Sequence, residues 1–166
     1  MSSSATATWY LLMEADEHHV FFAVVGFTGH PRNISLITGV EADDFWVEGE
    51  TFTEAMPEAR RRENRWILSS GLSRDAGHRD HFERLLYKLH PLAERLPGLM
   101  QDYRCGIGVS RFFFMDDPRF YLPDELIAAF HELGLDVGFD QLVPSAAGGL
   151  PEMDDEILNL PDEEDL

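Results

Sequence analysis

The chain has 166 residues, 44% of them hydrophobic, so it can bury the core of one domain without metal ions or disulfides. Its 31 acidic and 13 basic residues give a net charge of -18, the wrong sign for binding a phosphate backbone, and we expect no direct nucleic-acid binding. Cys105 is the single cysteine, so an intrachain disulfide is excluded. Neither a basic start nor a long apolar run indicates a signal peptide or a membrane span. We therefore expect a cytoplasmic protein that needs no cofactor and contacts no membrane.

The negative charge increases toward the end of the chain. Residues 151–166 contain eight acids and no base, and the turn-forming stretch "PSAAGGLP" precedes them. Such an acidic segment buries too little apolar surface to offset the entropy of ordering. We expect residues 1–143 to form a single α+β domain and residues 144–166 to form a linker and a flexible acidic tail.

The first half of the chain predicts strands, a short helix and a loop. The runs "ATWYLLM" and "HHVFFAVV", separated by "EADE", predict two strands, either as a hairpin or as one long bent strand. The stretch "PRNISLITGV" predicts a helix that starts at Pro31 and stops at Gly39. Residues 41–63 show no sustained period and include the basic run "ARRRENR", so they predict a long surface loop.

The second half alternates strands with clearer helices. "RWILSS" predicts a strand, and "HRDHFERLLYKLHPLAERL" predicts a helix that Pro91 should kink or break. "YRCGIGVSRFFFM" predicts a strand with Cys105, Ile107 and Val109 on one face and small residues on the other, where a helix could approach closely. "LDVGFDQLV" predicts the last strand, after a helix in "LPDELIAAFHELG" whose apolar stripe is Leu126, Ile127, Phe130 and Leu133. This order predicts an α+β fold, with a mixed, largely antiparallel sheet and helices packed on one face.

A metal-dependent enzyme is one functional hypothesis. His78, Asp80 and His81 lie near the start of the long predicted helix, and two histidines three residues apart can share a helix face as metal ligands do. The same residues are more typical of a helix start, where an acid is favoured by the helix dipole and histidines are solvated. Cys105 belongs to an apolar face, where thiols are usually inert. We therefore predict no metal site and no catalytic residue, and keep the histidine cluster as an alternative.

Several stretches of the sequence together resemble a known family. "ISLITGVEADDFWVEGE", "RWILSS", "HFERLLYKLHPLAERL" and "LPDELIAAFHELGLDVGFD" are similar to the bacterial domain of unknown function DUF4279, over roughly residues 18 to 142. The residues that fit the family pattern are Gly39, Val40, Trp46, Gly49, Glu50, Trp66, Leu68 and Ser70. This sequence has Ala42 and Asp43 where the family has a Pro-Thr pair. It also has Glu48 where the family has a basic residue before the glycine, so this loop is more acidic here.

The resemblance implies a role in binding, because members of the family resemble small bacterial proteins that are encoded beside polymorphic toxins and are suspected immunity proteins. It implies an immunity protein, which neutralises a cognate toxin by contact and needs no reactive group. An acidic surface suits a basic partner of this kind. The alternative is an inhibitor that mimics the charge of a nucleic acid. The sequence does not indicate the oligomeric state of the protein.

The contact residues are predicted in two places. The loop "DDFWVEGE" surrounds a large aromatic residue with acids, and binding energy in interfaces concentrates at tryptophan. The acidic tail would attract a basic partner over a longer range. The predicted partner-binding residues are Asp43, Asp44, Trp46, Glu48 and Glu50 in the loop and Asp154, Asp155 and Glu156 in the tail.

Overall fold

The computed structural model describes residues 17–53, 56–112 and 121–142. The predicted strand in "ATWYLLM" and the predicted tail at residues 144–166 therefore lie outside the described residues. The strands are β1 (Glu17–Val25), β2 (Asp44–Trp46), β3 (Thr51–Thr53), β4 (Met56–Arg60), β5 (Arg65–Ser69), β6 (Arg104–Phe112) and β7 (Val137–Leu142). The helices are α2 (Arg32–Thr38), α3 (His78–Leu89), α4 (Leu96–Asp102) and α5 (Asp124–Glu132), with a 3-10 turn η1 (His90–Leu92) after α3.

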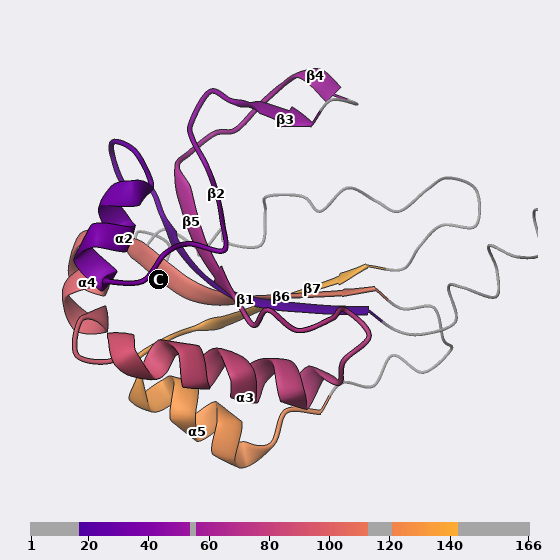
Figure 1. Cartoon of the computed structure of the whole chain (residues 1–166). Helices are drawn as coiled ribbons and strands as arrows, with labels where there is room; N and C mark the ends of the chain where they lie inside the picture. Colours follow the sequence, from indigo (N-terminus) through magenta and orange to yellow (C-terminus); the bar gives the residue numbers. More distant parts are fainter. Residues whose placement is uncertain (1–16, 54–55, 113–120, 143–166) are drawn as a thin grey trace, which may run out of the picture.

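Five strands form one mixed sheet in the order β2-β5-β1-β6-β7. All neighbours are antiparallel except β6 and β7, which are parallel because the chain crosses over through α5 between them. Helices α3 and α5 lie along one face of this sheet (Figure 1). The predicted α+β fold with a mixed, largely antiparallel sheet is confirmed.

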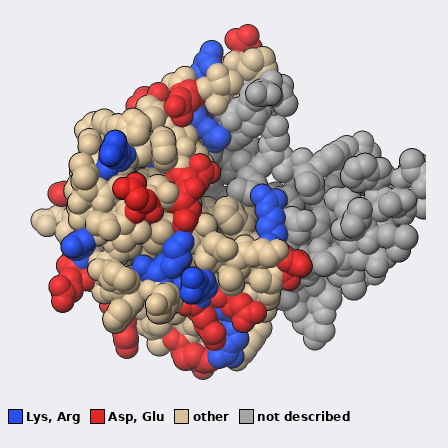
Figure 2. All heavy atoms as spheres, viewed as in Figure 1, with Lys and Arg blue, Asp and Glu red and all other residues tan. Residues whose placement is uncertain are grey.

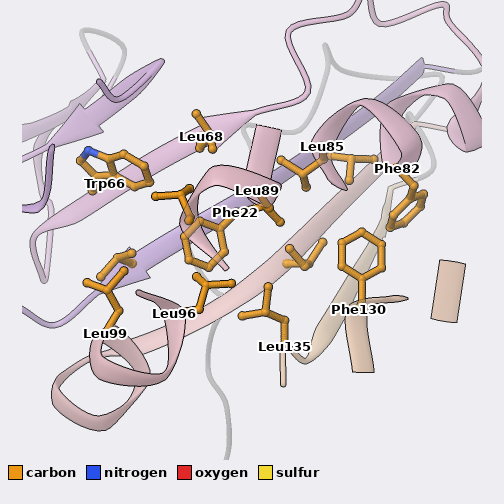
Figure 3. Close-up of a cluster of buried hydrophobic side chains, with 14 of the residues drawn as sticks. Phe22, Trp66, Leu68, Phe82, Leu85, Leu89, Leu96, Leu99, Phe130 and Leu135 are labelled. Atoms are coloured by element: carbon orange, nitrogen blue, oxygen red, sulfur yellow. The ribbon is translucent and has the colours of Figure 1, made fainter. Parts of the chain in front are cut away.

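The main core lies between the sheet and its helices. Alternate residues of β1, namely Val20, Phe22 and Val24, point into it together with Trp66 of β5 (Figure 3). The helices supply the facing side chains, which are Phe82, Leu85 and Leu89 of α3, Leu96 and Leu99 of α4, and Leu126 and Phe130 of α5. Each helix is therefore fixed by the apolar residues that its period places toward the sheet.

The other face of the sheet has a smaller apolar cluster of Phe21, Ala23, Val25 and Ile67, all buried. Phe21 pairs with Gly108 across β1 and β6, and a Cβ atom at Gly108 would lie only 2.3 Å from the Cζ atom of Phe21. The phenyl ring thus occupies the space that the missing side chain leaves. The expectation that a helix approaches this small-residue face is wrong, because the described helices pack on the opposite face.

The segment from residue 41 to 63 is more regular than the predicted surface loop. β2 pairs with β5 at the edge of the sheet, and β3 and β4 form a separate two-stranded arm that projects from it (Figure 1). The buried side chain of Asn64 fixes this segment, since it donates to the Phe27 carbonyl and accepts from the Glu48 amide, both at 2.8 Å. Strands of three residues contain too little alternation to be predicted from a period.

The long predicted helix is interrupted at Pro91, as the sequence indicates. α3 ends at Leu89, the turn η1 contains the proline, and α4 begins at Leu96. The ring of Pro91 removes one amide donor, so the helical hydrogen bonds cannot continue through this position.

Candidate protein-binding surface

The predicted binding loop carries its acids at the surface, but several of its side chains also make contacts within the domain. Asp43, Asp44, Glu48 and Glu50 are exposed. The Oδ2 atom of Asp43 accepts from the Lys88 ammonium at 2.6 Å, which joins the edge of the sheet to α3. This ion pair neutralises the charge of Asp43.

Trp46 also has an internal role. Its indole packs against the smaller apolar cluster of the sheet, and the guanidinium groups of Arg61 and Arg65 lie 4.2 Å and 4.9 Å from its ring centre. Such cation–π contacts stabilise the position of the ring. Trp46 is half-buried rather than fully exposed, and its role as an interface anchor stays a prediction. The predicted tail residues Asp154, Asp155 and Glu156 lie outside the described residues.

The histidine cluster is used for internal hydrogen bonds. The Nδ1 atom of His81 lies 2.6 Å from the Ser70 hydroxyl, and its Nε2 atom lies 3.1 Å from the Ser73 carbonyl. Because the carbonyl can only accept, Nε2 carries the proton and Nδ1 accepts from Ser70. His78 Nε2 lies 2.6 Å from the Tyr121 carbonyl. Among the residues that the structure describes, no group of three or more His, Cys, Asp or Glu side chains is arranged to hold a metal ion.

Ser70 and His81 are hydrogen-bonded to each other, as a catalytic nucleophile and its base would be, but both side chains are buried and a substrate cannot reach them. Ser70 is 3% exposed and His81 is 1% exposed. The hydroxyl of Ser70 also accepts from the Leu72 amide at 3.4 Å. We interpret the pair as a buried link between the turn after β5 and the start of α3.

Burial affects the protonation of two histidines. It lowers the pKa of His81, and the bond to the Ser73 carbonyl and the charge of Asp80 oppose it only in part. It also lowers the pKa of His19, where the charge of Arg74 acts in the same direction. Both side chains are therefore more often neutral in the folded chain than in the unfolded one.

Acidification should destabilise the fold through these two histidines. Below about pH 6.5, the ordinary pKa of histidine, the unfolded chain binds protons that the folded chain does not, so the free energy of unfolding falls as the pH drops. The loss is at most about 1.4 kcal/mol per pH unit for each histidine, and it ends below the lowered pKa of the folded state. Urea unfolding at several pH values between 5 and 7.5 measures it.

Two variants assign this pH effect. His81→Gln and His19→Gln each remove one of the two histidines whose pKa burial lowers, and each should reduce the slope of stability against pH. An equal slope in His81→Gln and in the original chain would show that His81 does not contribute.

Cys105 is not available as a nucleophile. Burial raises the pKa of its thiol to about 12, and its Sγ atom lies 3.7 Å from the Tyr103 carbonyl. The thiolate, which is the reactive form, is therefore scarce at neutral pH.

The acidic excess of the described residues is concentrated in one segment. These residues include 18 acids and 12 Lys or Arg side chains, and residues 121–142 contain five of the acids with no Lys or Arg. Elsewhere the two signs nearly balance and form ion pairs such as Asp43 with Lys88 and Glu83 with Arg79. Figure 2 shows acidic and basic side chains interspersed over the face that carries α3.

We define the acidic α5–β7 surface by Asp124, Glu125, Glu132 and Asp136. Asp124 and Glu125 lie in the first turn of α5, where negative charge is favourable, and Glu125 pairs with Arg79 at 3.0 Å. Glu132 and Asp136 are exposed at and just after the other end of the helix, where the dipole disfavours negative charge. Helix stability therefore does not explain these two acids.

Residues 16–144 match the family described as Domain of unknown function (DUF4279). The chain belongs to this family. No curated protein and no solved structure matches this DUF4279 chain. None of the helices within residues 17–53, 56–112 and 121–142 is long and apolar enough to cross a membrane.

The acidic surface of this DUF4279 domain was missed by the sequence analysis. The printed sequence contains the signal, since residues 121–142 lack Lys and Arg altogether. The net charge of the whole chain does not show where along the sequence the excess acids lie. The ion pair of Asp43 could not be read from the sequence, because Lys88 is 45 residues away and reaches the loop only through the fold.

Proposed function

We propose that this DUF4279 domain is a non-catalytic binding protein for a basic protein, and that the partner is a cognate toxin which the domain neutralises by direct contact. The acidic α5–β7 surface carries the proposal. A surface of one charge sign attracts an oppositely charged partner and fixes its orientation. This activity needs no reactive group in the domain.

The reactive side chains support the same interpretation. The Cys105 thiol is protonated at neutral pH, and the Ser70 and His81 pair is buried. An immunity role requires affinity and specificity rather than chemistry. The loop residues Asp44, Trp46, Glu48 and Glu50 and the acids of the tail are proposed as additional contacts.

Co-expression tests the proposal. The toxin candidate is the product of the gene beside this one in the source genome, expressed alone and together with this chain. We expect growth to be restored only by co-expression, and a complex of the two purified proteins to elute together in gel filtration. Absence of both protection and complex would contradict the proposed function.

A competition experiment separates immunity from charge mimicry. An immunity protein should bind its cognate toxin and should form no complex with unrelated basic proteins, whether or not duplex DNA is present. Binding to several unrelated nucleic-acid-binding proteins, reversed by DNA at the same ionic strength, would instead identify a mimic of nucleic-acid charge.

A further inference from the structure

An apolar groove opens between α5 and β7, on the elements that carry the acidic surface. Its volume is about 580 Å³, and its apolar lining consists of Tyr121, Leu122, Ile127, Phe130, Leu135, Val137 and Phe139. Tyr121, Ile127 and Phe139 are large apolar side chains with 71%, 50% and 46% of their surface exposed. Grouped exposed apolar residues with polar neighbours are typical of a binding site.

Ile127 does not have the buried position that the helical period predicts for it. Leu126 and Phe130 anchor α5 to the core, and both are buried. Ile127 lies beside them in the sequence but faces the groove, so the attachment of the helix does not depend on it. An isoleucine in this position is therefore explained better by a contact outside the domain than by its own folding.

The charges around the groove favour one kind of occupant. Asp136 and His131 are the polar residues that line the groove, and Asp124 lies in the first turn of the helix beside it. The described segment 121–142 that forms the groove contains no Lys or Arg. A second copy of the chain would bring the same acids against each other, and the chain's own residues 151–166 contain eight acids and no base. Like charges brought together in an interface are costly, so both of these occupants are disfavoured. A basic segment of another protein is the complementary choice.

We propose, on the basis of the proposed function, that this groove receives a large apolar side chain of the partner that is flanked by Lys or Arg residues. The apolar side chain fills the space between Ile127 and Phe139, and a flanking cation faces Asp136. The apolar contact supplies affinity because it is desolvated, and the acids select the sequence around it.

Synthetic peptides test this groove without the toxin. The probe is a five-residue peptide with one phenylalanine between two pairs of lysines, and its controls replace either the phenylalanine by serine or the lysines by glutamates. In ¹⁵N NMR titrations we expect the lysine–phenylalanine peptide to shift amides in residues 121–139, and each control peptide to bind at least about tenfold more weakly. Equal binding of the serine peptide, or shifts confined to other parts of the domain, would overturn the proposal.

Matched variants then place the contact. Ile127→Ser should weaken binding of the peptide at least about tenfold, whereas Leu36→Ser, at a position that is 76% exposed on α2, should leave it unchanged. Urea unfolding verifies that both variants are folded. Self-association of the original chain that Ile127→Ser abolishes would assign the groove to a second copy and would also overturn the proposal.

The two proposals fail separately. If the cognate toxin binds the original chain and the Ile127→Ser variant equally well, the groove is not the docking site although the immunity function stands. If the peptide binds as expected but no toxin is neutralised, the groove is a docking site and the proposed function is wrong.

Discussion

Reversing three charges of the acidic α5–β7 surface should slow binding of the cognate partner by about 10- to 100-fold at low ionic strength. The variant combines Asp124→Lys, Glu132→Lys and Asp136→Lys, all at exposed positions. The acids attract a basic partner before contact, so their loss lowers the association rate more than it raises the dissociation rate. Stopped-flow kinetics over a range of salt concentrations measures the effect, which should shrink as the Debye length decreases.

A second triple variant is the matched control. Asp44→Lys, Glu48→Lys and Glu50→Lys change the net charge by the same amount on the loop that the sequence analysis favours, and all three positions are exposed. If net charge alone governs association, the two variants slow it equally. A larger effect of the loop variant would assign the interface to the loop and contradict our choice of the α5–β7 surface.

Phe22→Ala should cause the largest loss of stability among these variants, about 3–5 kcal/mol in the free energy of unfolding. Phe22 lies on the central strand and is completely buried, and its ring meets the edge of Trp66 at 6.3 Å between ring centres. The substitution removes buried apolar surface and leaves a cavity between the sheet and its helices that the neighbouring side chains cannot easily fill. A loss of this size approaches the total stability of many domains.

Denaturation by urea, followed by far-UV circular dichroism, measures this loss. Phe45→Ala is the matched control, because it makes the same substitution at a phenylalanine that is 46% exposed on the edge strand β2. It should cost much less than Phe22→Ala. Similar losses for the two variants would mean that the core around Phe22 collapses to fill the cavity.

Elements with a strong period could be predicted from the sequence. The alternation in β1 and the spacing in α3 and α5 reflect the burial of one face of each element. Pro91 could be predicted to interrupt the helix because a proline has no amide hydrogen to donate. β2, β3 and β4 could not be predicted in this way, because three to five residues contain no measurable period and their pairing depends on β5 and on each other.

The candidate site was less predictable than the fold. Trp46 and Asp43 looked like free contact residues because their partners Arg61 and Lys88 reach them only in three dimensions. Ile127 fits the apolar stripe of α5 equally well in the sequence, yet only packing decides that Leu126 and Phe130 are buried while Ile127 is exposed. The groove lies between α5 and β7, and the place of β7 beside β6 in the sheet is not determined by periodicity.

The strand order has a consequence for how the chain folds during synthesis. β1 is the central strand of the sheet, and one of its two neighbours is β6, which comes much later in the sequence. Phe21 of β1, for example, pairs with Gly108 of β6. The ribosome must therefore release most of the domain before β1 can be enclosed. Until then the run "VFFAVV" has only β5 as a possible neighbour, and contacts this distant in sequence form slowly. We expect the nascent chain to depend on chaperones that cover apolar strands, and partial synthesis products that end before β6 to aggregate.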